Sequence, residues 1–261
     1  MGRKVRTNKC VSVNYFSGLR KSAHARIRRK ARHENRLASY LDQIRLRHLL
    51  KIVLSHTKAM SESTILDVGC REGPFSSSLA SLAQVGDIVG VDVEKWCLKR
   101  QKRNEKVSLV NSDANYLPFA VETFHIIICT SMLEHMLNLD GTLSKLKAIL
   151  QKNGILFVGY PLETTVFKNI WRAVSPREFK FIDQTQTLFV NPYSHKLEDY
   201  WKLPSTHKQT YLSIRKGLDK NFRLVRRIKL PFGFLPDSAN YYEIAELIID
   251  SDKQLNEQLV K

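Results

Sequence analysis

The chain has 261 residues, of which 43% are hydrophobic and 26% charged, a composition typical of a soluble globular protein. No apolar run approaches the roughly 18–20 residues that a membrane-spanning helix needs, and the basic N-terminus lacks the apolar segment of a secretion signal. The four cysteines form no CxxC pair, which predicts neither a disulfide framework nor a metal site. We therefore expect a cytoplasmic protein without an integral membrane segment.

The net charge of +17 is concentrated near the N-terminus. Residues 1–60 hold 16 Lys and Arg against 2 Asp and Glu, whereas the remainder holds 26 against 23. We expect residues 1–60 to form a basic tail and helix, for which three interpretations stay open. Residues 20–58 bind RNA or another polyanion, or they lie on an anionic membrane surface and make the protein peripheral to the membrane, or they are only a solvated helix face.

The first predicted element is a helix over residues 21–58, where leucines and isoleucines recur at helical spacing between arginines. From residue 64 on, strands and helices alternate, which is typical of a mostly parallel sheet covered on both faces. The expected strands are 64–69, 87–93, 107–113, 125–131 and 155–160; the expected helices start at Pro74 and at Glu94 and span 139–152, the last with a C-cap at Asn153-Gly154.

The alternation weakens over residues 163–206, which hold scattered Trp and Pro and which we interpret as an inserted lobe. Segments 222–230 and 240–249 then predict two closing strands. The expected divisions of the chain are thus 1–60, 61–162, 163–206 and 207–261.

Acidic residues stand at or near the ends of three successive predicted strands: Asp67, Asp92 and Asp113. The carboxyl ends of parallel strands share one edge of a sheet, where ligands of such folds bind. Three carboxylates at that edge suit a ligand with hydroxyls, an amino group or a positive charge.

The turn after the first strand resembles a dinucleotide-binding turn but departs from it. It reads Gly69-Cys70-Arg71-Glu72-Gly73, and the third glycine of the GxGxxG pattern is replaced by Pro74. The neighbouring carboxylates would repel a phosphate. A cationic nucleoside without phosphate fits better, and S-adenosylmethionine is such a molecule.

Four segments, ILDVGCREG, IVGVDVE, NSDANYLPFAVETFHIIICTSMLEH and LSKLKAILQKNGILFVGYP, resemble in order and spacing the motifs of class I S-adenosylmethionine-dependent methyltransferases. The nearest group is the type 11, or ubiquinone-menaquinone-biosynthesis-like, group, and the resemblance covers residues 62–162. It implies an α/β fold: a Rossmann-like three-layer sandwich with a seven-stranded, mostly parallel sheet whose last strand is antiparallel. On this basis residues 61–162 are the cofactor-binding core and residues 163–206 an acceptor lobe.

The resemblance also implies roles for individual residues. Asp67, Gly69 and Gly73 would line the methionine end of the cofactor, Asp92 would hold the ribose hydroxyls, Asp113 would meet the adenine amino group with Ala114 beside it, and Ser131 and Leu133 would close the floor under the sulfonium. The sequence departs from the pattern at Arg71, where glycine is usual, and at His125, where aspartate is usual.

The expected function is methyl transfer to a small-molecule or lipid-linked acceptor. The alternatives are an RNA methyltransferase that uses the basic arm and a non-catalytic binding module of the same fold. The cofactor motifs do not identify a catalytic base; His135, after the fourth strand, is a candidate. Candidate acceptor contacts lie in or just after the inserted lobe: Tyr193, His195, His207 and Tyr211.

Overall fold

The computed structural model describes residues 36–57, 63–82, 85–162, 208–230, 233–234, 236–237 and 240–249. Its strands are β1 (Ile65–Val68), β2 (Ile88–Asp92), β3 (Val107–Asn111), β4 (Phe124–Thr130), β5 (Leu150–Pro161), β6 (Phe222–Leu230) and β7 (Tyr242–Ile249). Its helices are α3 (Arg36–Thr57), α4 (Pro74–Ala80), α5 (Lys95–Leu98), α6 (Leu139–Ile149) and α10 (Tyr211–Asn221), with 3-10 turns η1 (Ala114–Tyr116) and η2 (Leu133–His135).

The strands form one seven-stranded sheet in the order β3-β2-β1-β4-β5-β7-β6. β1 to β5 are parallel, whereas β7 is antiparallel to both β5 and β6. The predicted fold class is therefore confirmed, including the antiparallel last strand and the hairpin that it forms with β6. The chain order reverses between β1 and β4, which places a ligand-binding switch point at their carboxyl ends.

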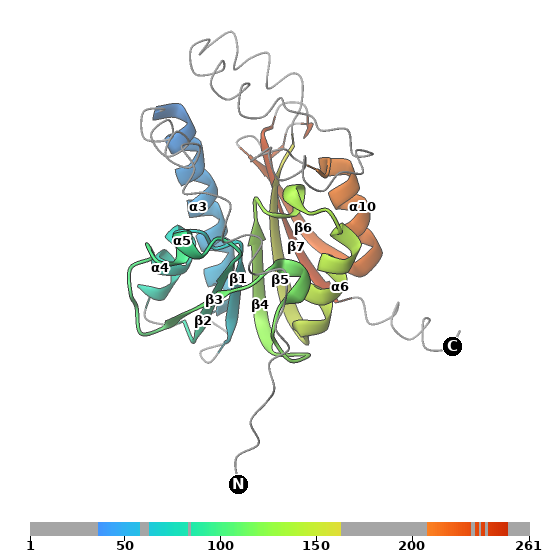
Figure 1. Ribbon diagram of the computed structural model, residues 1–261. Helices are drawn as coiled ribbons and strands as arrows, with labels where there is room; N and C mark the ends of the chain where they lie inside the picture. Colours follow the sequence, from blue (N-terminus) through green and yellow to red (C-terminus); the bar gives the residue numbers. More distant parts are fainter. Residues whose placement is uncertain are drawn as a thin grey trace, which may run out of the picture.

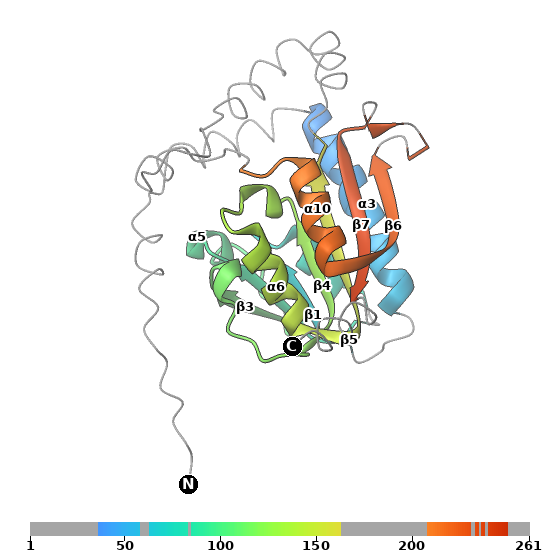
Figure 2. The same ribbon diagram turned by 90° about the vertical axis from the view of Figure 1, so that its right-hand side faces the viewer.

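Helices cover both faces of the sheet: α3, α4 and α5 lie on one side, and α6 and α10 on the other (Figure 1). Figure 2 looks onto the face covered by α6 and α10. Each face has its own buried core. Leu49 and Val53 of α3 and Leu79 of α4 pack on one, and Leu146 of α6 and Leu218 of α10 pack on the other.

Helix α3 begins nine residues before its contact with the carboxyl rim of the sheet and then runs toward the middle of the sheet. Near the rim, the Arg45 guanidinium lies 4.7 Å from the centre of the Tyr242 ring. Further along the helix, Nε2 of His56 is 3.1 Å from Oε1 of Glu246. The described C-terminal part of the basic segment is thus packed into the fold by its buried apolar face.

The ends of two helices differ from the sequence prediction. Helix α5 ends at Leu98, whereas the basic segment 94–104 predicted a helix that continues to Asn104. Helix α6 ends at Ile149, and β5 begins at Leu150, so the expected C-cap at Asn153-Gly154 is wrong. The cause is pairing of Leu150 with Phe124, which extends β5.

Helix α10 was not expected at all, and the predicted lobe 163–206 lies outside the described residues. Within those residues, none of the helices combines the length and the apolar character needed to cross a membrane.

Candidate active site

The three predicted acidic residues lie along one rim of the sheet. Asp67 is in β1, Asp92 is the last residue of β2, and Asp113 follows β3 by two positions. Because β3, β2 and β1 are neighbours, the three side chains come from adjacent strands at their carboxyl ends. The geometry that the sequence predicted is therefore present.

The turn after β1 folds back over the end of β2. The backbone N–H groups of Gly69 and Cys70 donate to the carbonyl of Val91 over 2.8 and 3.0 Å. Gly69 and Gly73 have φ values of 77° and 71°, a region that L side chains rarely adopt. A Cβ on Gly69 would also lie 3.1 Å from Cγ of Met132. Gly69 therefore allows the turn to approach the residues after β4, and both glycines suit its left-handed backbone.

Arg71 takes part in the site through its backbone. It has φ 53°, a left-handed conformation that costs a non-glycine residue about 1 kcal/mol. Its N–H donates to Oδ2 of Asp92 over 2.8 Å, and its side chain is exposed. The turn that is usual with glycine is thus preserved with arginine, and the charge of Arg71 opposes the rise in the pKa of Asp92.

Asp92 is buried, yet its carboxylate oxygens can still accept further hydrogen bonds. Besides the bond from Arg71, Oδ1 of Asp92 accepts the N–H of Glu94 over 2.8 Å. Burial raises the pKa of Asp92 above its ordinary value, while these two backbone donors oppose the rise. A carboxylate has about four lone-pair sites, so each oxygen of Asp92 can accept one more bond. Two neighbouring hydroxyls on a ligand match that arrangement.

Asp67 faces the inside of the fold. The hydroxyl of Ser76 in α4 donates to Oδ2 of Asp67, which ties the strand to the helix that follows the turn. Burial raises the pKa of Asp67 to about 6; the bond from Ser76 opposes the rise, and the charge of Asp92 adds to it. Asp67 therefore stands behind the turn and supports it.

Asp113 lies on the part of the rim formed by the end of β3. Its Oδ1 accepts the backbone N–H of Asn115 over 2.8 Å and the side-chain amide over 2.9 Å. Asn115 in turn accepts the hydroxyl of Thr142 over 2.9 Å, which connects the rim to α6. Ala114 is buried in η1. The carboxylate is thus held in place, half-buried, at the end of β3.

The residues after β4 lie next to the turn at Gly69–Gly73. Ser131 has φ 51°, and its N–H donates to the carbonyl of Gly159 over 2.7 Å. Leu133 is fully buried in the core on the α6 side, so its side chain packs the fold. His135 is half-buried in η2, with its backbone N–H donating to Met132.

Two residues that the sequence did not single out surround Ser131. Nη1 of Arg45 lies 3.1 Å from Oγ of Ser131, and the hydroxyl of Tyr242 lies 3.0 Å from the same atom. Arg45 is one of many arginines in a basic helix, and Tyr242 stands in an apolar strand, so no sequence signal marks either one.

Of the predicted acceptor contacts, Tyr211 is the first residue of α10, and its ring lies 5.2 Å from the Arg215 guanidinium. Tyr193, His195 and His207 lie outside the described residues.

Comparison with known families identifies the central segment. A family model described as "Methyltransferase domain" matches residues 66–158. That segment contains the turn, the ends of β1 to β4 and most of β5. The resemblance inferred from the motifs is therefore confirmed over this part of the chain.

Curated relatives match over limited lengths. Identity is 27% over 135 residues with malonyl-[acyl-carrier protein] O-methyltransferase of Legionella pneumophila, covering 50% of this chain and 43% of that protein. It is 38% over 80 residues with the mitochondrial ubiquinone biosynthesis O-methyltransferase of Saccharomyces cerevisiae, covering 29% and 26%. Demethylmenaquinone methyltransferase of Staphylococcus saprophyticus is 28% identical, covering 60% and 67%. The chain thus spans less than half the length of the first two relatives.

Solved structures share the fold. Magnesium protoporphyrin IX methyltransferase of Synechocystis PCC 6803, solved with bound SAH, has a TM-score of 0.60 at 15% identity, over 93% of this chain and 100% of that one. The PH0226 protein of Pyrococcus horikoshii has a TM-score of 0.55 at 16% identity, over 80% and 91%. At such identities the likeness concerns the arrangement of the sheet and helices.

Proposed function

We propose that this protein is an S-adenosylmethionine-dependent methyltransferase. The observation that carries the proposal is the buried Asp92 carboxylate, held at the end of β2 by the N–H groups of Arg71 and Glu94. It faces the same rim as the turn with two left-handed glycines and the end of β3. The match of residues 66–158 to the methyltransferase family and the names of the relatives agree with this assignment.

The residues at the rim fit the cofactor. Asp92 offers acceptors to the two ribose hydroxyls, and the half-buried Asp113 offers one to the adenine amino group. The carboxylates of Asp67 and Asp92 are close enough for the charge of one to raise the pKa of the other. A cationic ligand relieves that repulsion, whereas a phosphate would increase it. The carboxylates at the rim thus favour a nucleoside that carries a positively charged sulfonium.

The chain's contribution to the reaction is mainly positioning. Bound at this rim, S-adenosylmethionine would supply a methyl group on a positively charged sulfur, a leaving group that would take the carbon–sulfur electron pair in an in-line displacement by the acceptor. Asp92 and the turn at Gly69–Gly73 orient the nucleoside and the methionine end. Met132, whose Cγ would lie 3.1 Å from a Cβ on Gly69, limits the space beyond the turn. Holding two reactants in line supplies a large part of such a rate enhancement.

For the acceptor, we propose a small or lipid-linked molecule. The relatives above are named as methyltransferases of malonyl-[acyl-carrier protein], of ubiquinone biosynthesis and of demethylmenaquinone. If the attacking group is a hydroxyl, a base must remove its proton, and His135 is the candidate for that role. RNA as acceptor draws no support from the relatives.

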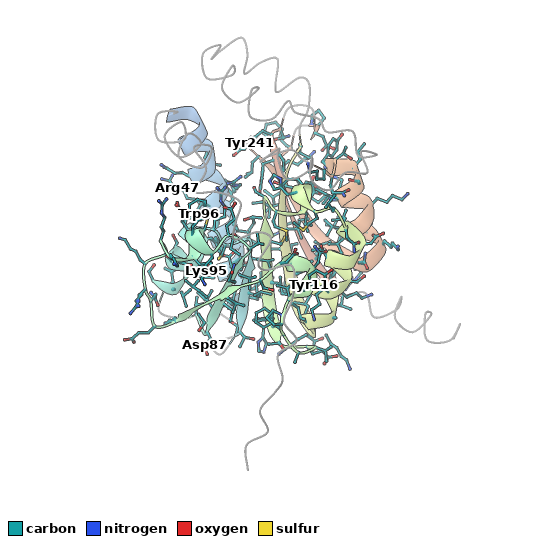
Figure 3. The ribbon with its side chains drawn as sticks, in the orientation of Figure 1. Arg47, Asp87, Lys95, Trp96, Tyr116 and Tyr241 are labelled. Atoms are coloured by element: carbon teal, nitrogen blue, oxygen red, sulfur yellow. The ribbon has the colours of Figure 1, made fainter. Side chains whose placement is uncertain are left out.

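Calorimetry with S-adenosylhomocysteine tests the proposal. We expect saturable binding to the full chain and a loss of about 10–100-fold in affinity in Asp92→Ala, because two charge-assisted hydrogen bonds disappear. Asp87→Ala, an exposed aspartate labelled in Figure 3, is the matched control. Absence of binding to the unaltered protein, or equal binding by Asp92→Ala, contradicts the assignment.

A further inference from the structure

The turn after β1 carries an arginine where its backbone favours glycine. Arg71 has φ 53°, and Gly69 and Gly73 of the same turn have φ 77° and 71°. Glycine adopts this left-handed region freely, whereas a side chain there has a cost. The family pattern avoids that cost with a glycine at this position. An arginine here therefore points to a role for its guanidinium that offsets the cost.

The guanidinium of Arg71 has no fixed partner among the described residues. The backbone N–H of Arg71 donates to Asp92, but its exposed side chain makes no hydrogen bond or ion pair with any residue that the structure describes. The adjacent acid, Glu72, pairs instead with Arg100 over 3.3 Å. The charge of Arg71 acts on Asp92 through space, since it opposes the rise in the pKa of that carboxyl. A cation thus lies beside the carboxylate proposed to bind the donor's ribose, without forming an ion pair with it.

The backbone of the turn has little capacity left for an anion. Of the five N–H groups in Gly69–Gly73, two donate to the carbonyl of Val91 and one to the carbonyl of Cys70. A fourth donates to Oδ2 of Asp92. A nest of several N–H groups aimed at one anionic ligand therefore does not form in this turn. An anionic group bound here needs a side-chain donor.

The proposed donor brings such a group to the turn. The methionine end of S-adenosylmethionine carries an amino group and a carboxylate, and Gly69–Gly73 is the segment that we assigned to that end. The charges of Asp67 and Asp92 attract the sulfonium and the amino group but repel the carboxylate. The carboxylate needs a neighbouring cation, and Arg71 is the cation of this segment.

We propose that Arg71 binds the methionine carboxylate of the donor. The assignment rests on the proposed function and adds to it a contact that glycine, the usual residue at this position, cannot make. A guanidinium matches a carboxylate in charge and in its planar, two-point geometry. Arg71 is thus a specificity residue, which favours a nucleoside with the intact amino-acid end over one that lacks the carboxylate.

Two ligands that differ in one group test this contact. S-adenosylhomocysteine has the carboxylate, whereas 5′-deoxy-5′-(3-aminopropylthio)adenosine keeps the nucleoside, the sulfur and the amino group but lacks it. Both are titrated by calorimetry into the unaltered full chain, Arg71→Gly, Arg71→Gln and Arg71→Lys. We expect the unaltered chain to bind S-adenosylhomocysteine about tenfold tighter than the decarboxylated ligand. This preference should vanish in Arg71→Gly and Arg71→Gln and return in part in Arg71→Lys.

The decarboxylated ligand also shows whether the rest of the site is intact. Glycine keeps the N–H that donates to Asp92 and suits φ 53°, so Arg71→Gly should unfold at a urea concentration no lower than the unaltered protein does. Each Arg71 variant should bind the decarboxylated ligand within about threefold of the unaltered chain. Arg103→Gly, which removes an exposed arginine after α5, is the matched control and should keep the full preference.

The outcomes separate this inference from the proposed function. Absence of binding of both ligands by the unaltered chain contradicts the proposed function, and the inference with it. If S-adenosylhomocysteine binds, three results overturn the role of Arg71 alone. One is equal affinity of the unaltered chain for the two ligands, and the second is a preference that survives in Arg71→Gly and Arg71→Gln. The third is an equal loss of both ligands in these variants, which would mean that Arg71 acts through the turn or through Asp92.

Discussion

At the scale of single residues, the buried carboxyl of Asp67 links the site to the stability of the fold. Its pKa is raised from 3.8 to about 6, so the folded state holds this proton more tightly than the unfolded chain does. Unfolding then releases a proton between about pH 4 and pH 6, and the free energy of unfolding falls as the pH rises through that window. Above about pH 6 this loss in the free energy of unfolding is complete, and it amounts to at most about 3 kcal/mol.

Asp67→Asn should remove this dependence. We expect the free energy of unfolding of the variant, minus that of the unaltered protein, to rise by about 1–3 kcal/mol between pH 4 and pH 7. Urea unfolding followed by circular dichroism at both pH values measures the difference. Asp87→Asn, which changes an exposed carboxyl, should show no such rise. A difference that stays constant with pH would contradict the burial argument.

A second residue-scale feature is the contact between Gly73 and Gln101. A Cβ on Gly73 would lie 1.9 Å from Nε2 and 2.1 Å from Cδ of Gln101. Gln101 is only 7% exposed, and neither polar atom of its amide has a hydrogen-bond partner among the described residues. The Gln101 amide thus loses no hydrogen bond when it moves, but the buried site leaves it little space in which to do so.

Gly73→Ala should cost about 2–4 kcal/mol of stability, from overpacking and from the left-handed backbone. In the double variant Gly73→Ala with Gln101→Ala, the overpacking is relieved, so the combined loss should be smaller than the sum of the single losses. A double-mutant cycle in urea measures the coupling. Strictly additive losses would show that Gln101 does not limit the space at Gly73.

The sequence predicted those residues whose role depends on a local pattern. Asp92 and the two glycines belong to segments next to a strand end, and their backbone setting follows from that place. Arg45 and Ser131 are 86 positions apart in the chain, and only the packing of α3 on the sheet brings them together. Charge and composition around Arg45 give no sign of this contact.

At the scale of elements, buried strands were predictable and helix ends were less so. The middle of β4 and the second half of β5 are apolar runs, 126–129 and 155–160, whose buried residues stand out in the sequence. Helix α10 buries only Ile214, Gly217 and Leu218, so its apolar pattern is too sparse to mark it. Its N-cap Thr210, whose hydroxyl accepts the N–H of Ser213 over 3.1 Å, was a signal that the prediction missed.

Helix α10 is joined to β7 by a buried charge cluster. Glu243 in β7 is fully buried, and Arg215 of α10 donates Nε to its Oε1 over 3.1 Å and an Nη2 proton to its Oε2. The hydroxyl of Tyr160 in β5 donates to Oε1 as well. The pKa of Tyr160 is raised, mainly by burial and then by the charge of Glu243.

Arg215→Met should therefore cost about 3–5 kcal/mol, because a buried carboxylate loses its main partner. In that variant only Arg227, whose Nε lies 3.4 Å from Oε1, still offsets the charge of Glu243. Adding Glu243→Gln removes this poorly compensated charge, so the double variant should be more stable than Arg215→Met alone. Thermal or urea unfolding gives the comparison. Lys220→Met, which removes a distant and exposed ion pair of the same helix with Asp140, should change stability very little. A loss in Arg215→Met no larger than in this control would contradict the argument.

At the scale of the whole molecule, the concentration of positive charge in residues 1–60 predicts how binding to polyanions depends on salt. The Lys and Arg residues of positions 1–60 outnumber the acidic ones by 16 to 2. Each phosphate neutralised on a single-stranded nucleic acid contributes about 0.7 to the slope of log affinity against log salt. Binding through this segment should therefore weaken steeply with ionic strength.

Replacing Arg26, Arg28, Arg29 and Lys30 by Gln should lower the salt slope of RNA binding by about 3, since up to four phosphates lose a partner. Replacing four exposed cations of the body, Lys99, Lys102, Arg103 and Lys216, is the control and should leave the slope nearly unchanged. Fluorescence anisotropy with labelled RNA at several salt concentrations measures it. Sedimentation with anionic vesicles tests a membrane surface in the same variants. An unchanged salt slope with RNA, together with unchanged sedimentation with vesicles, would exclude both RNA and an anionic membrane as partners of this segment.

The direction of α3 has a consequence for such a partner. The helix contacts the rim at Arg45, and nine residues of it, about 13 Å of helix, precede that contact. The chain before residue 36 is therefore joined to the fold at a point about 13 Å of helix away from the rim at Ser131. If the proposed function holds, a carrier or surface captured by that chain would be tethered near the rim, and its methyl-accepting group would meet the bound donor at a local concentration far above that in bulk solution.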